Sequence, residues 1–350
     1  MPTPTDPRTT ERCLSPVTCG HLLRYASDFE QIEGRLESKV MPPTLGKGTL
    51  RKQPMPSGGE DFLGLTRSSG AGNLVVVGVP WDVTSSYRRG AAAGPDAIRR
   101  ATSSRLYNRF TEQGRDLGSL WRVCDHGNVK ARSVSGLKKA LAEDVDLHNH
   151  DDQTTLFLGG DHFITHPCFS AIAKKHGRPL SLLYVDAHPD LYETYEGVAY
   201  SHATVVSRIL DEKNLSSGHV CYLGIRASTR EQDERIKSLG LTVHTTRDVC
   251  EKGCDAVGSL VRSELLHEPV YLSLDLDCLD PAFAPGVGNP QPGGLSVRQI
   301  LDILHALAGL EVVAADIVEY CPEAESEART TAFTSAILIK ELMGTMANLP

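Results

Sequence analysis

The chain has 350 residues, 40% of them hydrophobic and 23% charged, which is the composition of an ordinary globular protein. Its formal net charge of -8 argues against a nucleic-acid or membrane-surface binder, because proteins of those classes are normally basic. An acidic protein suits a cationic substrate. We therefore expect a small cationic substrate as the partner, and no nucleic acid or membrane.

The expected compartment is the cytoplasm. No apolar run approaches membrane-spanning length, and the N-terminal residues lack the hydrophobic core of a signal peptide. The nine cysteines are scattered and include no CxxC pair, so we interpret them as buried thiols in a reducing compartment.

Residues 1–72 differ from the rest of the chain because turn-forming residues are frequent there, notably in 41–43, 53–59 and 68–72. We interpret this segment as an N-terminal extension that packs on its own or a neighbouring subunit; a lid over the active site is the alternative. A short helix is expected within it at 21–26. Residues 73–350 are expected to form the catalytic domain.

The catalytic domain is predicted to begin with a buried strand at 73–80, which is almost entirely apolar. A loop rich in Gly, Ser and Arg follows, and a helix opens at Pro95. Arg88 and Arg89 of this loop are interpreted as solvated charges rather than ligand contacts.

Strand and helix patterns alternate from Thr154 to the C-terminus. Strands are predicted at 154–158, 182–185, 220–225, 241–245, 270–276 and 312–318, and helices at 167–175, 203–212, 231–239, 256–266, 297–307 and 330–346. Such alternation predicts an α/β fold whose parallel sheet is covered by helices on both faces.

Three of the predicted strands end in Asp and His residues. Asp275 and Asp277 are two residues apart, so they point to the same side of an extended chain. Ligands of parallel sheets bind beyond the carboxyl ends of the strands, and we expect these three ends to meet there. The candidate ligands are His162, Asp186, His188, Asp190, Asp275 and Asp277.

Carboxylates and imidazoles suit Mn²⁺, Ni²⁺, Fe²⁺ or Zn²⁺, and four carboxylates can neutralise two divalent cations. A water held between two such cations has its pKa lowered toward about 7, which supplies hydroxide at neutral pH. A single Asp at a strand end is usually a cap or turn residue, and Asp161 and Asp280 are interpreted in that way. Cys278 is not expected to act as a catalytic thiol.

Several of these motifs resemble the ureohydrolase family, which includes arginase and agmatinase. The resemblance covers about residues 73 to 347 and rests on several motifs in the family's order. Three motifs carry most of it: Gly159-Gly160-Asp161-His162, Asp186-Ala187-His188-Pro189-Asp190 and Ser273-Leu274-Asp275-Leu276-Asp277. Further matches lie at 78–80, 94–99, 280–286 and 316–320.

The resemblance implies a three-layer α/β/α fold and a metal-dependent amidinohydrolase that converts a guanidino compound to urea and an amine. Two divalent metal ions per subunit are implied, Mn²⁺ as the usual metal and Ni²⁺ as the other option, with a metal-bridging hydroxide as the nucleophile. One metal would be held by His162, Asp186, Asp190 and Asp275, and the other by Asp186, His188, Asp275 and Asp277.

Two further roles follow from the resemblance. Glu319 would pair with the substrate guanidinium, and His202 would relay a proton to the leaving amine. Homo-trimers or hexamers are the usual assemblies, and a hetero-oligomer is the alternative.

The expected substrate is agmatine-like rather than arginine. The loop at 191–202 lacks the Asn with which arginases hold the amino-acid end of arginine, and an α-carboxylate would meet Glu193 or Glu196 there. Val198 stands where plant arginase-like members carry Asn, and Phe163 is expected to shorten the pocket. The alternative is a hydrolase of free guanidine, an alkyl-substituted guanidine or a biguanide with a dinickel centre.

Two other classes remain open on sequence. One is a deacetylase-type amidohydrolase with a single zinc, which would leave several carboxylates unpaired. The other is a non-enzymatic regulatory or scaffolding subunit, whose usual mark is loss of ligands; no candidate ligand is missing in this sequence.

Overall fold

The computed structural model describes residues 62–65, 72–103, 107–148, 153–212 and 215–347. Most of the predicted N-terminal extension, including the expected helix at 21–26, lies outside these residues. Its boundary with the catalytic domain therefore stays a prediction.

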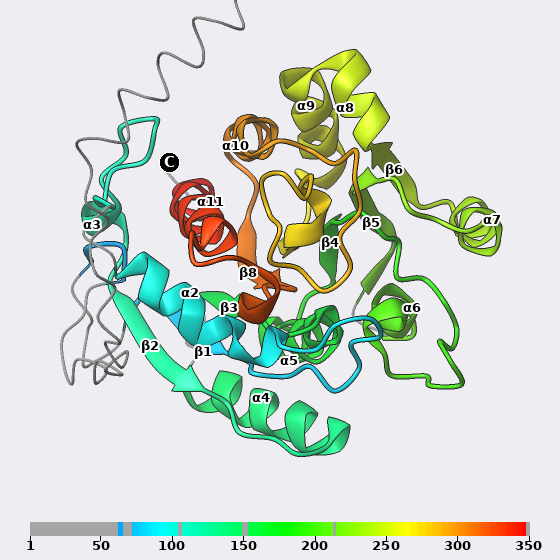
Figure 1. Cartoon of the computed structure of the whole chain (residues 1–350), viewed down its shortest axis with the longest axis horizontal. Helices are drawn as coiled ribbons and strands as arrows, with labels where there is room; N and C mark the ends of the chain where they lie inside the picture. Colours follow the sequence, from blue (N-terminus) through cyan, green and yellow to red (C-terminus); the bar gives the residue numbers. More distant parts are fainter. Residues whose placement is uncertain (1–61, 66–71, 104–106, 149–152, 213–214, 348–350) are drawn as a thin grey trace, which may run out of the picture. The chain divides into compact units, whose positions relative to one another are not determined.

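The described residues form one eight-stranded sheet in the order β2-β1-β3-β8-β7-β4-β5-β6 (Figure 1). Every neighbouring pair of strands is parallel. The strands are β1 (Leu74–Gly78), β2 (Val123–Asn128), β3 (Thr154–Leu158), β4 (Leu180–Val185), β5 (Leu215–Ile225), β6 (Thr242–Thr245), β7 (Val270–Asp275) and β8 (Val312–Val318). The predicted fold class is thus confirmed.

Helices cover both faces of the sheet (Figure 1). One face packs on α2 (Gly94–Thr102), α3 (Leu117–Leu120), α8 (Thr246–Lys252), α9 (Cys254–Leu265), α10 (Val297–Ala306) and α11 (Thr330–Met346). The other packs on α4 (Val134–His148), α5 (Thr165–His176), α6 (Val205–Leu210) and α7 (Arg230–Leu239). Short 3₁₀ helices are η1 (Ala91–Ala93), η2 (His162–Ile164), η3 (His202–Thr204), η4 (Leu276–Cys278) and η5 (Pro322–Ala324).

The two cores follow from the alternation of side chains along each strand. In β1, Leu74 and Val76 contribute to the α2 and α11 side, whereas Val75 and Val77 contribute to the α4 and α5 side. Both faces of a parallel sheet are covered, so each strand can be apolar at every position. This explains why β1 has the continuous apolar sequence that predicted it.

Residues 62–65 belong to the core although they fall within the predicted extension. Phe62, Leu63 and Leu65 are each at most 2% exposed, and the Leu63 amide donates to the Thr102 carbonyl at 3.0 Å. Among the described residues, no helix is both long and apolar enough to cross a membrane.

Candidate metal centre and active site

The candidate site lies at the carboxyl ends of four neighbouring strands, β3, β8, β7 and β4. His162 follows β3, Glu319 follows β8, Asp275 ends β7, and Asp186 follows β4. Because the strands are parallel, all four ends open on the same edge of the sheet. Sequence positions up to 157 residues apart therefore meet, as the His162–Glu319 contact shows.

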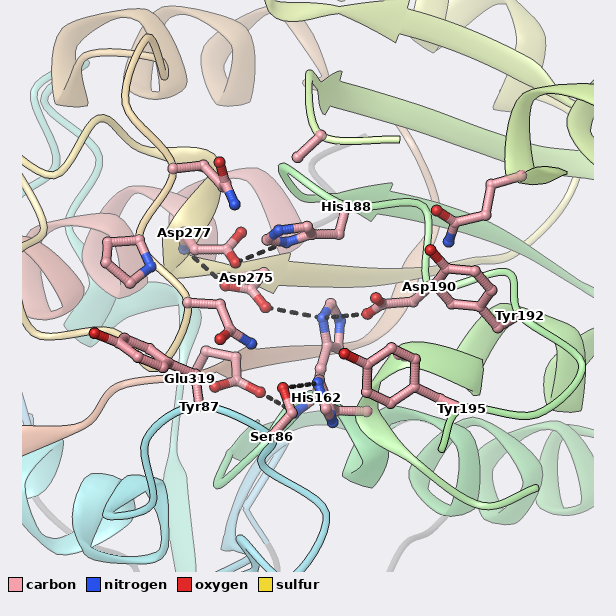
Figure 2. A pocket seen from close by; sticks show the side chains of 17 residues that line it. Ser86, Tyr87, His162, His188, Asp190, Tyr192, Tyr195, Asp275, Asp277 and Glu319 are labelled. Carbon is pink, nitrogen blue, oxygen red and sulfur yellow. Dashed lines mark hydrogen bonds and ion pairs between the residues drawn. The ribbon is translucent and has the colours of Figure 1, made fainter. Parts of the chain in front are cut away.

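The structure brings all six predicted metal ligands together, and their side chains fall into two groups that share Asp186. In the first group, His162 Nδ1 lies 2.9 Å from Asp186 Oδ2, 2.9 Å from Asp275 Oδ2 and 3.5 Å from Asp190 Oδ2. Figure 2 shows His162, Asp190 and Asp275 pointing toward one another.

The second group places His188 Nδ1 3.0 Å from Asp277 Oδ2 (Figure 2). The same nitrogen lies 3.5 Å from Asp186 Oδ1. Asp186 thus turns one oxygen to each histidine, which is the geometry of a bridging carboxylate. Asp275 contributes Oδ2 to the first group, while its Oδ1 accepts the Asp277 amide at 2.7 Å.

A chain of hydrogen bonds behind His162 engages Nε2, so Nδ1, which the Tyr184 hydroxyl approaches to 3.1 Å, is the atom that would bind a cation. The Ser273 hydroxyl donates to Asp316 Oδ1 at 2.7 Å, so its oxygen can accept the Nε2–H of His162, 2.8 Å away. A histidine that donates one ring N–H presents the lone pair of the other nitrogen, which is the usual arrangement at metal ligands.

The donor set fits a pair of divalent cations. Asp186 Oδ2 is fully buried and has no hydrogen-bond partner, because its 2.9 Å contact with His162 lacks hydrogen-bond geometry. Three carboxylate oxygens face one imidazole nitrogen, and only a proton or a cation placed between them can offset the desolvation of these groups.

Burial and mutual repulsion disturb the ionisation of these carboxyl groups. Burial, followed by the charge of Asp186, raises the pKa of Asp190 to about 7. Burial and the charge of Asp277 hold the pKa of Asp275 well above its ordinary value. Burial alone would lower the pKa of His188, yet its contacts with Asp277 and Asp186 raise it to about 12. The raised pKa values show that negative charge is crowded in a small buried volume, and bound cations would favour the ionised form of these carboxyl groups.

Two site residues have strained backbones. Asp190 has φ of 46° and Glu319 has φ of 65°, a left-handed region that residues with a side chain rarely adopt. Such conformations persist only where the surrounding structure imposes them, and they gather at functional sites.

Glu319 lines the cavity above the two groups (Figure 2). Its Oε1 accepts the backbone amide of His162 at 2.7 Å, and its own amide donates to the Gly160 carbonyl at 2.9 Å. Burial and the charge of Asp161 hold the pKa of Glu319 well above its ordinary value. A cationic substrate would favour the ionised form of this carboxyl group.

His202 also lines the cavity, and its ring has a defined tautomer. Nδ1 lies 2.6 Å from the Thr84 carbonyl oxygen, which can only accept, so Nδ1 carries the proton. Nε2, 3.2 Å from the Ser86 hydroxyl, is then the acceptor. Burial lowers the pKa of His202 to about 4, so the ring is neutral at physiological pH.

Asp161 organises the loop that holds His202. Its Oδ2 accepts the Thr84 amide at 2.9 Å and the Thr84 hydroxyl at 2.7 Å, and that hydroxyl oxygen lies 3.1 Å from the His202 amide. Asp161 is therefore not an ordinary turn residue, contrary to the sequence interpretation. Asp280 is one, since it accepts the amides of Ala282, Gly293 and Gly294.

The cavity has a volume of about 520 Å³. Beyond the candidate ligands, Glu319 and His202, its wall is mostly aromatic and amide: Tyr87, Tyr192, Tyr195, Gln232, Asn289 and Gln291. Among the described residues that line it, there is no Lys or Arg. Arg88 and Arg89 are exposed, as expected for solvated charges, and neither lines the cavity.

Two expectations about the pocket are wrong. Phe163 does not shorten it, because this side chain is 0% exposed and packs against Trp81, His166 and Tyr200. Glu193 does not face the substrate, because Arg208 and Arg235 bind it outside the cavity.

Neither Glu196 nor Val198 of the same loop lines the cavity. The cavity does contain an asparagine amide, but it belongs to Asn289, in the segment that follows η4.

Two supporting residues also escaped sequence reasoning. Tyr184, within β4, stacks on the His162 ring at 4.5 Å and donates to Asp190 Oδ2 at 2.7 Å. Ser273, within β7, is the contact of His162 Nε2. Tyr184 lies two residues before Asp186, and Ser273 lies two residues before Asp275. The alternate spacing that identified the aspartates could therefore have identified these two residues as well. Cys278 is 0% exposed and burial holds the pKa of its thiol well above the ordinary value, which excludes a thiolate nucleophile.

The chain is similar to several proteins of known name. Residues 72–344 match the Arginase family. Arginase 1, mitochondrial, of Oryza sativa is 38% identical over 275 residues, or 76% of this chain and 79% of that protein. Proclavaminate amidinohydrolase of Streptomyces clavuligerus is 34% identical over 265 residues, or 71% of this chain and 80% of that protein.

Solved structures agree with these sequence matches. The structure of the Streptomyces clavuligerus enzyme has a TM-score of 0.74 at 29% identity and covers 82% of this chain and 96% of that one. A hypothetical agmatinase from Burkholderia thailandensis has a TM-score of 0.71 at 33% identity, with coverage of 82% and 87%. The chain belongs to the arginase family of amidinohydrolases, enzymes that act on carbon–nitrogen bonds of amidines.

Proposed function

We propose that this protein hydrolyses an agmatine-like guanidino compound to urea and an amine with two divalent metal ions. The single observation that carries the proposal is the pair of Asp/His groups joined by Asp186 at the floor of a cavity that also contains Glu319. Two groups joined by one carboxylate favour this reaction over a deacetylase with a single zinc.

In this proposal, the first metal is held by His162, Asp186, Asp190 and Asp275, and the second by Asp186, His188, Asp275 and Asp277. Bound there, the two cations supply a water with its pKa lowered toward about 7. The ligand set accepts both Mn²⁺ and Ni²⁺, and Mn²⁺ is the metal we propose.

The chain's own groups orient the substrate and move a proton. Glu319 receives the guanidinium through charge-assisted hydrogen bonds, for which its planar carboxylate suits a planar donor fork. The neutral Nε2 of His202 would take up the proton that the attacking water releases and pass it to the nitrogen that leaves as the amine. The Thr84 carbonyl accepts a hydrogen bond from Nδ1–H, and the Ser86 hydroxyl contacts Nε2, so the ring is held in place for this transfer.

The cavity wall supports a substrate without an amino-acid end. No lining Lys or Arg is available, among the described residues, to pair with an α-carboxylate. The aromatic rings of Tyr87, Tyr192 and Tyr195 can cover an alkyl chain and attract a terminal ammonium group. Free guanidine would fill only a small part of a cavity of about 520 Å³, so it is the second candidate.

The test is a panel of agmatine, arginine, guanidine, methylguanidine and a biguanide, each assayed for urea with the protein loaded with Mn²⁺ or Ni²⁺. We expect agmatine or a similar alkylguanidine to give the highest kcat/KM, and bound metal to reach about two ions per subunit. Arginine as the preferred substrate would refute the substrate assignment. One metal per subunit, or no urea from any member, would refute the reaction.

We further propose a cytoplasmic homo-trimer or hexamer, with an N-terminal extension ahead of a catalytic domain at 73–350. The absence of a membrane-spanning helix among the described residues is compatible with this location. Fractionation of cells and light scattering of the purified protein test the two statements separately.

A further inference from the structure

A second group of metal-binding side chains lies outside the candidate active site. Cys221 of β5, His244 of β6 and Glu264 of α9 each offer a ligand atom, and these three atoms lie within 4.8 Å of one another. The Cys221 thiol donates to Glu264 Oε2 at 3.4 Å, and His244 Nε2 lies 3.4 Å from Glu264 Oε1.

The fold sets this group in place. β5 and β6 are parallel neighbours, with Cys221 opposite Thr242 and Leu223 opposite His244. Cys221 and His244 are thus two positions apart along the pair and lie on the same face of the sheet. α9 packs against β5 (Figure 1). Glu264 of this helix contacts both Cys221 and His244.

His244 has an unsatisfied ring nitrogen. Its side chain is 6% exposed, and the buried Nε2 has no hydrogen-bond partner, since the 3.4 Å contact with Glu264 lacks hydrogen-bond geometry. A buried polar atom without a partner is costly and calls for an explanation. A cation bound by Nε2 would provide one.

We propose that Cys221, His244 and Glu264 form a zinc site, separate from the Asp/His centre. Zinc binds sulfur at about 2.3 Å and nitrogen or oxygen at about 2.0–2.2 Å, so tetrahedral ligands lie about 3.4–3.6 Å apart. Glu264 reaches each partner at 3.4 Å, with Oε2 toward the Cys221 sulfur and Oε1 toward His244 Nε2, and one ligand atom from each residue lies within 4.8 Å of the others. A small rotation of the Glu264 carboxylate would bring one oxygen to the tetrahedral spacing from both. Glu264 keeps 34% of its side chain exposed, which leaves a route for the ion and for a water as fourth ligand.

The two sites would take different ions. A thiolate is a soft ligand that favours zinc over manganese, whereas the Asp/His centre offers mainly hard oxygen atoms. Without an ion, burial and the charge of Glu264 hold the pKa of the Cys221 thiol well above its ordinary value, so the thiol keeps its proton. When zinc binds, it displaces that proton: the S–H bond breaks, a metal–sulfur bond forms and the proton passes to solvent, without any change in oxidation state. The ion would join the edge strand β6 to β5 and α9. This site does not depend on the proposed reaction.

Co²⁺ is the probe, because it takes the place of zinc and gives a strong charge-transfer absorption only when a thiolate binds it. The full-length protein is first given serine at five cysteines outside this group, so that only buried thiols remain beside Cys221: Cys13, Cys19, Cys124, Cys250 and Cys254. The Asp/His centre lacks a thiolate among its candidate ligands and adds no such band.

We expect the band to saturate at about one Co²⁺ per subunit and to disappear when Zn²⁺ is added. Cys221→Ser should abolish it, and His244→Gln and Glu264→Gln should weaken Co²⁺ affinity by about 10-fold or more. The matched control is Cys168→Ser, an equally buried change, which should keep the band.

Zinc should also raise Tm by a few degrees in the Mn²⁺-loaded parent and not in Cys221→Ser. The proposal would be overturned if the parent gave no thiolate band. It would also be overturned if Glu264→Gln and His244→Gln folded and bound Co²⁺ with the same band and unchanged affinity. Glu264 is partly exposed, so Glu264→Gln is expected to fold. This variant therefore still tests the proposal if Cys221→Ser fails to fold.

Discussion

Ser273→Ala tests whether the hydrogen-bond chain behind His162 prepares it to bind metal. Ser273 is 0% exposed, and its hydroxyl links His162 Nε2 to Asp316 at 2.8 and 2.7 Å. Asp316 keeps a second donor, the Tyr271 hydroxyl at 2.7 Å. The substitution therefore removes support mainly from His162.

The expected loss comes from the ring of His162. Without the Ser273 oxygen, the Nε2–H loses its acceptor and the ring loses both its tautomer and its orientation. Loss of such a partner typically lowers metal affinity about 10- to 100-fold, or about 1.4–2.7 kcal/mol. A buried N–H left without a partner further costs roughly 1–3 kcal/mol of folding stability.

The metal-free protein is titrated with Mn²⁺, and calorimetry and urea release report the metal affinity. Denaturant unfolding reports the folding stability of the same variants. Ser181→Ala is the matched control. Ser181 is also 0% exposed and lies on the adjacent strand β4, but its hydroxyl has no hydrogen-bond partner. We expect metal affinity in this control to stay within about 2-fold of the parent.

The reasoning fails if Ser273→Ala binds Mn²⁺ as tightly as Ser181→Ala does. It fails equally if both variants lose affinity to the same extent, because the effect would then come from packing at the sheet rather than from the contact with His162.

Three further outcomes are expected. Asp277→Ala should abolish urea release and lower bound metal from about two ions to about one per subunit while the protein stays folded; retained turnover would remove Asp277 from the site. His202→Asn should lower kcat by about 100-fold or more. Burial lowers the pKa of His202 from 6.5 to about 4, so the unfolded chain binds this proton first as pH falls. The parent should lose on the order of 3 kcal/mol of unfolding free energy between about pH 6.5 and 4 that His202→Asn does not lose; equal slopes would contradict this pKa. Deletion of 1–61 should change assembly or substrate access more than metal content. Deletion of 1–71 should in addition cost roughly 4–9 kcal/mol, because it removes the buried side chains of 62–65; equal denaturation midpoints for the two deletions would show that this segment adds no stability.

Sequence reasoning missed β2 and α4 for two different reasons. β2 has one buried residue, Val123, because it lies at the edge of the sheet, and so its sequence lacks the apolar run of a central strand. α4 does carry a signal, since Leu137, Leu141 and Val145 are buried at a spacing of four. The other positions of α4 include many charged residues, so the apolar stripe was not recognised in the sequence.

The sequence by itself determined the parallel α/β fold and the set of six candidate ligands. Continuous apolar strands and amphipathic helices are local patterns, and a polar residue directly after a buried strand must lie at the sheet edge. Alternate spacing then gives the direction of each side chain relative to its strand neighbours.

Only the tertiary structure decided which groups face one another. The strand order brings β3, β8, β7 and β4 together, and no local pattern specifies that order. Packing turns Phe163 into the core and pairs Glu193 with two arginines, while Thr84 reaches both Asp161 and His202 across the fold. Contacts between distant segments depend on the register and packing of whole elements, so the sequence predicts which residues can react and the fold determines what surrounds them.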